Sequence, residues 1–139
     1  PALLCDAPRV LLFVYGSLLR GEDNHAVLTG ARFVATARTA PRYTLVDLGP
    51  YPALVLGGDT AVSGELFEVS PALLAELDDF EGHPDFYVRS PVDLSPASVP
   101  ASLPPLPPHS SAQAYLLPPE RAAGYATLPS GDWRAHRAV

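Results

Sequence analysis

One carboxyl group in this sequence is aimed at an apolar surface, a placement that suits proton transfer. Residues 70–82 read as a helix, because Ser70 can cap the free amides, Pro71 suits the first helical position and Gly82 suits the end. Its apolar face consists of Leu73, Leu74, Leu77 and Phe80. At ~100° per residue, Glu81 projects from that face. Apolar surroundings disfavour the charged carboxylate and should raise its pKa towards that of a general acid or base.

Two other interpretations of this acidic helix remain open. Glu81 lies at the helix end, so it could instead pair with Arg89 or turn out to solvent. The neighbouring acids also invite a Ca²⁺ or Mg²⁺ site, but such ligands must converge on the ion, and several of these side chains diverge around the helix. We therefore predict no metal. The acids of the cluster are Glu76, Asp78, Asp79, Glu81 and Asp85.

The turn after the first buried strand is a second place for chemistry. Residues 10–15 read VLLFVY and lead into Gly16, Ser17 and Leu18. A glycine here lets the backbone turn sharply and present N–H groups to a carboxylate or a developing oxyanion. The turn lacks the glycine spacing of a P-loop or a dinucleotide fingerprint, so we predict no cofactor. Ser17 has no G-x-S-x-G elbow, and the histidines are scattered, which disfavours a serine hydrolase.

Strand-like runs recur along the chain and are separated by turn residues. The expected strands are residues 10–15, 32–38, 43–48, 53–56, 61–69, 86–94 and 112–117. We expect a hairpin between 53–56 and 61–69, across residues 57–59. A short helix should follow the first strand, capped by Asp23 or Asn24.

Composition excludes several classes of protein. A chain of 139 residues with 47% hydrophobic residues fits one domain over residues 1–139. The net charge is −6 and no Arg-rich run occurs, which argues against nucleic-acid and membrane partners and favours small molecules or peptides. The single cysteine, Cys5, cannot form an internal disulfide. Because the longest apolar run is far short of ~20 residues and the first residues lack a signal-peptide pattern, we expect a soluble, cytoplasmic protein.

Residues 95–111 form a proline-rich stretch that cannot donate a regular ladder of backbone hydrogen bonds. We interpret it as an exposed loop within the domain. The alternative is a proline-rich ligand for an SH3-like partner.

Four segments in this order resemble the gamma-glutamylcyclotransferase-like, or AIG2-like, superfamily. They are FVYGSLLRGEDNH at 13–25, YPALV at 51–55, GELFEV at 64–69 and LDDFEGHPDFYVR at 77–89. The likeness covers about residues 10–117 and is strongest to the gamma-glutamylamine cyclotransferase branch. It implies an α+β fold, a small mixed β-barrel flanked by a few helices, with the active cavity at one end.

The resemblance also implies roles for particular residues. Glu81 takes the place of the family's catalytic glutamate, in agreement with the helical periodicity. Tyr87 would orient Glu81 or contact the substrate, and Tyr115 would line the cavity; ordinary packing roles for both tyrosines remain open. The residues expected to hold the substrate are Tyr15, Gly16, Ser17, Leu18, Tyr87 and Tyr115.

The expected activity is therefore cyclisation of a gamma-glutamyl amine, or a related gamma-glutamyl compound, to 5-oxoproline with release of the free amine. Glu81 would act as general acid and base. The leaving group stays open among an alkylamine, the side-chain amine of lysine, an amino acid and a small metabolite. Two alternatives are a non-catalytic domain of the same fold that binds a small metabolite, and an interaction module that uses the proline-rich loop.

Overall fold

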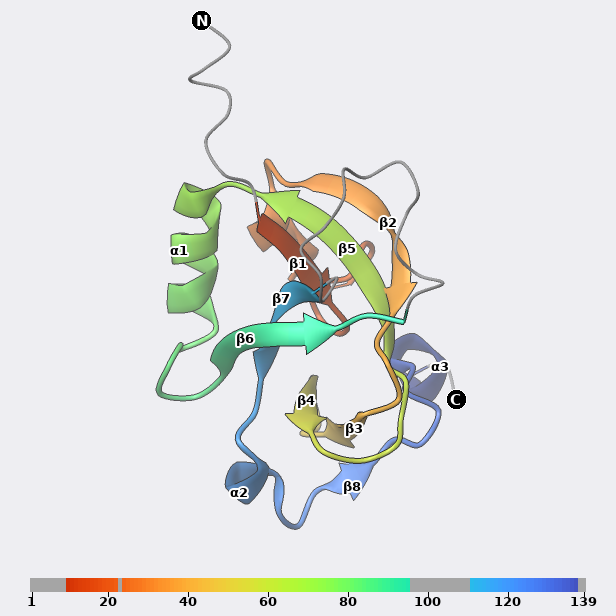
Figure 1. Ribbon diagram of the computed structural model, residues 1–139. Helices are drawn as coiled ribbons and strands as arrows, with labels where there is room; N and C mark the ends of the chain where they lie inside the picture. The colour runs from red at the N-terminus through yellow and green to blue at the C-terminus, as the bar shows by residue number, and fades with distance from the viewer. Residues whose placement is uncertain (1–9, 23, 96–110, 138–139) are drawn as a thin grey trace, which may run out of the picture.

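A mixed sheet of eight strands forms the centre of the computed structural model, which describes residues 10–22, 24–95 and 111–137 (Figure 1). The strand order is β2-β5-β1-β7-β4-β3-β8, and β6 pairs with β7. The strands are β1 (Val10–Val14), β2 (Arg32–Arg38), β3 (Tyr43–Asp47), β4 (Pro52–Leu56), β5 (Ser63–Val69), β6 (Val88–Asp93), β7 (Ser111–Leu116) and β8 (Ala126–Thr127). The expected strands are confirmed, with ends that differ by at most two residues. Most of the proline-rich stretch, residues 96–110, lies outside the described residues.

Short helices accompany the sheet, and α1 is the longest of those described. The 3₁₀ helix η2 (His25–Leu28) is preceded by Asn24, whose side chain makes no capping hydrogen bond, while Asp23, the other predicted cap, lies outside the described residues. In α1 (Pro71–Phe80) the Ser70 hydroxyl accepts a hydrogen bond from the Leu73 N–H at 3.1 Å, as the cap predicts. The others are α2 (Pro119–Ala122) and α3 (Trp133–Arg137). Within the described ranges, no helix has the length and apolar character required to cross a membrane.

Strand β1 is buried on both faces. Leu12 and Val14 belong to the apolar core that lies against α1, whereas Phe13 and Tyr15 belong to a second core on the other face. Successive side chains of a strand point to opposite faces, so the unbroken apolar run of β1 fits a strand that is covered twice. The sheet curves around these cores but does not close between β2 and β8, so the expected barrel is only approximate.

The predicted hairpin between 53–56 and 61–69 is wrong. Strand β4 pairs antiparallel with β3, through a turn in which the Asp47 carboxylate accepts the Gly49 N–H at 2.7 Å. Strand β5 instead pairs with β1 and β2. The chain leaves β4 through Gly58, which has a φ of +130° and lies against β3, where a Cβ would stand 2.3 Å from the Thr44 Oγ1. Tertiary packing sets the strand partners, and the spacing of the glycines did not predict them.

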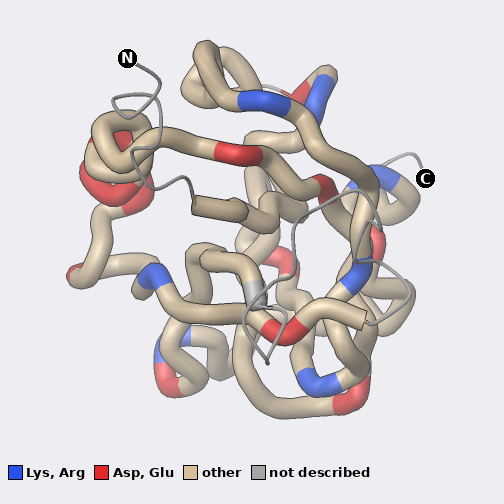
Figure 2. Tube along the Cα trace, turned by 45° about the horizontal axis from the view of Figure 1, so that its top comes forward, with Lys and Arg blue, Asp and Glu red and all other residues tan. Residues whose placement is uncertain are grey.

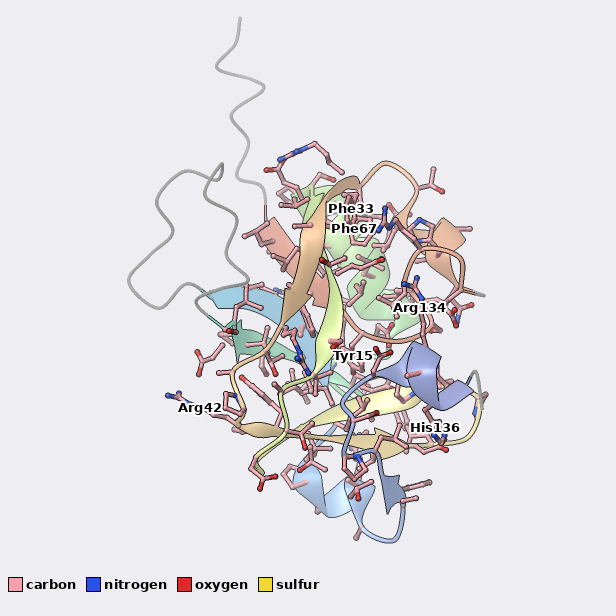
Figure 3. All side chains as sticks on the ribbon, turned by 90° about the vertical axis from the view of Figure 1, so that its right-hand side faces the viewer. Tyr15, Phe33, Arg42, Phe67, Arg134 and His136 are labelled. Atoms are coloured by element: carbon pink, nitrogen blue, oxygen red, sulfur yellow. The ribbon has the colours of Figure 1, made fainter. Side chains whose placement is uncertain are left out.

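Strand β7 joins the two halves of the sheet. One edge of β7 pairs with β6 along its whole length. The other edge meets β1 at Gln113 and then β4 at Leu116, both in parallel orientation. The hydroxyl of Tyr15, in the interior of the molecule (Figure 3), donates to the Tyr115 carbonyl oxygen at 2.5 Å and accepts the Leu54 N–H at 3.1 Å. The Tyr15 hydroxyl therefore takes the place of backbone hydrogen bonds at the point along β7 where the neighbouring strand changes from β1 to β4.

Replacing Tyr15 by Phe should lower the free energy of unfolding by about 1–3 kcal/mol, because the buried Leu54 N–H loses its acceptor. Tyr125→Phe is the matched control, since the Tyr125 side chain is 49% exposed. Urea denaturation of both variants checks the prediction. Equal, small losses of stability in the two proteins would contradict a structural role for the Tyr15 hydroxyl.

Candidate active site

A cavity of about 170 Å³ opens where α1 and β1 end. All the residues predicted to catalyse the reaction or hold the substrate line it, although they come from four separate parts of the chain. They are Tyr15, Gly16, Ser17, Leu18, Glu81, Tyr87 and Tyr115. The tertiary structure thus gathers these residues at one place.

Among the described residues that line this cavity, only Glu81 has a formally charged side chain. Its N–H donates to the Leu77 carbonyl oxygen at 2.8 Å and closes α1, and its side chain is half-buried. Burial raises the pKa of Glu81 from 4.5 to about 7. Among the described residues, none forms a hydrogen bond or ion pair with its carboxyl group. The carboxyl is therefore poised to exchange a proton near neutral pH.

The alternative partner, Arg89, is occupied by another acid. Its guanidinium donates to the two Asp78 carboxylate oxygens at 2.7 and 3.1 Å, and Asp78 also accepts the Tyr115 hydroxyl at 2.8 Å. Partial burial pulls the pKa of Asp78 upward, but these hydrogen bonds outweigh it and hold the pKa below its ordinary value. Figure 2 shows the acidic residues gathered along α1. Asp78 is thus bound to Arg89 and Tyr115, whereas Glu81 lines the cavity. The two carboxylates therefore do not converge on one metal ion.

The turn at Gly16, Ser17 and Leu18 offers a group of backbone N–H donors beside the cavity. The carbonyl oxygen of Gly16 accepts the Leu19 N–H at 3.0 Å, and that of Ser17 accepts the Asn24 N–H at 2.9 Å. No described residue accepts a hydrogen bond from the N–H groups of Gly16, Ser17 or Leu18. All three residues line the cavity. Their N–H groups therefore form a set of donors suited to an anionic group.

Close packing explains the glycine at the start of this turn. A Cβ at Gly16 would stand 2.6 Å from two ring carbons of Pro52, so only glycine lets β4 approach. The carbonyl oxygen of Pro52 accepts the Tyr87 hydroxyl at 3.0 Å. Burial raises the pKa of the Tyr87 hydroxyl, which keeps it protonated as a donor. The Tyr87 hydroxyl is thus directed at the backbone of β4, while its ring lines the cavity.

A buried glutamate on β5, missed in the sequence, anchors the loop that continues from this turn. Glu65 is 2% exposed, and its carboxylate accepts the Arg20 N–H at 2.9 Å and the Arg20 Nε at 3.1 Å. Arg134 of α3 reaches the same carboxylate at 3.5 Å and also donates to the Arg20 carbonyl oxygen (Figure 3). The Arg20 guanidinium covers the Phe33 ring, 3.6 Å from its centroid. No local pattern links residues this far apart in sequence.

Other lining residues were not predicted as site residues. Tyr51 and Pro52 fall in the YPALV segment, which was the available signal for them. Phe80 was assigned to the apolar face of the helix, but its side chain is 47% exposed and borders the cavity. Phe86 likewise borders it, on the loop that follows α1.

Comparison with known proteins shows which family the chain resembles in sequence and in fold. The family model described as "Gamma-glutamyl cyclotransferase, AIG2-like" matches residues 12–135. The chain is 35% identical over 123 residues to the "Putative gamma-glutamylcyclotransferase" of Vibrio cholerae, covering 88% of this chain and 94% of that one. It is 40% identical over 89 residues to the human "Gamma-glutamylaminecyclotransferase", covering 58% of each protein. The crystal structure of a Mus musculus AIG2-like protein superposes with a TM-score of 0.66 and 30% identity, over 89% of this chain and 88% of that one.

Glu81→Gln should make the protein more stable at alkaline pH. The native pKa of about 7 lies above the ordinary value, so the native state favours the protonated carboxyl, and its stability falls as pH rises from about 4.5 through 7. Allowing for partial exposure, the wild type should be about 1–3 kcal/mol less stable than Glu81→Gln at pH 8. The two proteins should unfold alike at pH 4. Urea denaturation at both pH values measures this, and a difference that does not change with pH would contradict it.

Glu65→Gln should destabilise the protein, because it removes the buried charge that two arginines share. Since both arginines remain partly open to water and Gln can still accept the Arg20 N–H, we expect a loss of about 1–3 kcal/mol in the free energy of unfolding. Glu68→Gln is the matched control on the same strand, where Glu68 pairs with Arg32 near the surface. Urea denaturation compares them, and faster amide hydrogen exchange over residues 17–22 should accompany Glu65→Gln alone.

Proposed function

Since the chain belongs to the AIG2-like gamma-glutamyl cyclotransferase family, we propose that it cyclises a gamma-glutamyl amine, or a related gamma-glutamyl compound, to 5-oxoproline and releases the free amine. The observation that carries the proposal is Glu81, a half-buried carboxyl group with a pKa of about 7 at the edge of the cavity and with no partner among the described residues. A binding pocket without chemistry gains little from such a group, because an unpaired buried carboxylate reduces stability.

The reaction needs little beyond correct positioning and proton transfer. The alpha-amine of the gamma-glutamyl group attacks its own gamma-carbonyl carbon and closes a five-membered ring, a proximity advantage that the substrate itself supplies. A C–N bond forms within the new ring, the amide C–N bond to the leaving amine breaks, and one proton passes from the attacking amine to the leaving amine. Water is not consumed, and no covalent bond to the protein forms.

Glu81 is the group we assign to that proton. As a carboxylate it takes the proton from the attacking amine, and as a carboxylic acid it delivers the proton to the departing nitrogen. A pKa of about 7 suits both halves of this cycle, because neither form is strongly disfavoured at neutral pH. Arg89 does not neutralise Glu81, because its guanidinium is held by Asp78.

The backbone N–H groups of Gly16, Ser17 and Leu18 are the groups we assign to the substrate's negative charge. They would hold its alpha-carboxylate or the oxyanion of the tetrahedral intermediate. Tyr87 and Tyr115 would shape the walls, because their hydroxyls are held by Pro52 and Asp78 while both residues line the cavity. Tyr15 would support the floor through the β1–β7–β4 junction.

Two expectations about the setting of this reaction remain part of the proposal. We treat residues 1–139 as a single domain. We place the activity in the cytoplasm, since a single cysteine suits a reducing compartment.

Release of 5-oxoproline, followed by mass spectrometry, tests the activity on a panel of gamma-glutamyl amines and dipeptides. Glu81→Gln should lower kcat/KM by roughly 10²–10⁴-fold, the usual contribution of a general acid or base. Glu76→Gln, on an exposed position of the same helix, is the matched control and should retain activity. The wild-type kcat/KM should rise with pH through about 7, because the attacking step needs Glu81 as carboxylate.

Two other outcomes would change the proposal. Binding of gamma-glutamyl compounds or 5-oxoproline, measured by calorimetry without turnover, would replace the enzyme by a metabolite-binding domain. Turnover that survives in Glu81→Gln would remove Glu81 from the proton transfer while leaving the activity in place.

A further inference from the structure

A histidine side chain holds one backbone carbonyl of the turn at residues 16–18. Nδ1 of His25 lies 2.9 Å from the carbonyl oxygen of Leu18, and the contact is partly buried. A carbonyl oxygen can only accept a hydrogen bond, so Nδ1 carries the proton and donates it. The carbonyl oxygens of Gly16 and Ser17 are bound instead by backbone N–H groups. Within the described part of the chain, His25 is therefore the side chain that holds the backbone of this turn.

The hydrogen bond from His25 connects to the cavity through two peptide groups. A peptide group is planar, so binding its carbonyl oxygen also fixes the direction of its N–H. The peptide group that His25 holds joins Leu18 to Leu19. The Leu19 N–H donates to the Gly16 carbonyl oxygen at 3.0 Å, and that carbonyl shares a peptide group with the Ser17 N–H at the cavity. This chain of hydrogen bonds therefore ends at the Ser17 N–H, and each bond in it polarises the next.

The His25 ring is itself supported by packing against the sheet. It lies against the ring of Phe67 on β5, with centroids 5.7 Å apart, and Phe67 is buried. Phe67 in turn meets Phe33 of β2 edge-on at 5.6 Å (Figure 3). The backbone N–H of His25 also donates to the Glu22 carbonyl oxygen at 3.2 Å. The sheet thus fixes the position of the ring, and the ring can fix the position of the turn.

His25 can act on a ligand of the cavity only through this turn. It does not belong to the described lining of the cavity, so its ring is not placed to exchange a proton with the substrate. Of the two anions that we assign to the turn, the alpha-carboxylate is a permanent charge. The described lining contains no arginine or histidine to balance that charge. Binding of the carboxylate therefore depends on how well the backbone N–H groups are oriented in advance.

We propose that His25 is a positioning residue for substrate binding, which acts through the Leu18 carbonyl to orient the N–H groups of the turn towards the substrate's alpha-carboxylate. The inference rests on the proposed function, because that function supplies the carboxylate. Loss of the Nδ1–H donor should weaken binding and leave the proton transfer at Glu81 unchanged. The carboxylate is equally negative in the ground state and in the transition state, so the effect falls on KM and not on kcat.

Two substitutions of similar shape test the donor itself. The amide group of Asn can donate in place of Nδ1–H, whereas Leu has nearly the same shape and no donor. His25→Leu should raise KM roughly 10-fold, the value of one well-formed hydrogen bond, while His25→Asn should keep KM within about 3-fold of the wild type. The value of kcat should change by less than about 2-fold in both variants. The assay is release of 5-oxoproline from the gamma-glutamyl compound on which the wild type has its highest kcat/KM.

His136→Leu is the matched control, because His136 bonds the Asp47 carboxylate on α3 and β3 and does not line the cavity. It should keep both kinetic constants. Damage to the fold lowers the concentration of active enzyme, and hence the apparent kcat, without raising KM. An unchanged KM in His25→Leu, an equal rise of KM in His25→Leu and His25→Asn, or a fall in kcat alone would overturn the positioning role while the cyclisation stands.

Nitrogen NMR of the His25 ring tests the same contact without turnover. The neutral ring should carry its proton on Nδ1, and a proton on Nε2 alone would overturn the proposal. Absence of 5-oxoproline from every compound with the wild type would instead overturn the proposed function, which distinguishes the two failures.

Discussion

The hydroxyl of Tyr15 is the contact on which the rest of the architecture depends. Strand β7 is shared by β1 and β4 along one edge, and two parallel strands cannot both occupy the same stretch of that edge. Where they diverge, backbone groups would lose their partners in the interior, at a cost typical of buried unsatisfied polar groups. Tyr15 satisfies Leu54 and Tyr115 at this point. The same divergence leaves the turn at Gly16 free of strand pairing and able to form one wall of the cavity.

Among the described residues, the ion pairs leave the half-buried carboxyl group of Glu81 without a cationic partner. Arg89 is bound by Asp78, and Arg20 and Arg134 are bound by Glu65, so these three described arginines already have carboxylate partners. Glu81 is left half-buried with a raised pKa and lowers the stability of the native state above neutral pH. Such a loss of stability is typical of functional groups, because a protein selected for stability alone would pair the charge or remove it. The arrangement thus distinguishes the carboxylates of Asp78 and Glu65, which are held in ion pairs, from the half-buried carboxyl group of Glu81 at the cavity.

The cavity combines a few buried or half-buried polar groups with an exposed apolar rim, and both follow from where the elements end. The buried part is bordered by backbone donors of the β1 turn and by tyrosines whose hydroxyls are already bonded. The rim is bordered by Phe80 and Phe86, which lie on either side of Gly82, a glycine just beyond the C-cap of α1. With a φ of +70°, Gly82 reverses the chain and brings both rings to the mouth. One local reversal therefore places the carboxyl group and the apolar rim together.

The amino-acid sequence by itself determined the local elements and the direction of Glu81. Capping by Ser70, the stop at Gly82 and the apolar periodicity between them are short-range features, so α1 and its inward-facing carboxyl could be predicted. The wrong hairpin shows the limit, because strand pairing depends on which distant surfaces bury each other. Only the tertiary structure decided that Glu65 would be buried between two arginines and that Phe80 would remain exposed. These outcomes depend on contacts between residues far apart in the chain, which neither spacing nor composition encodes.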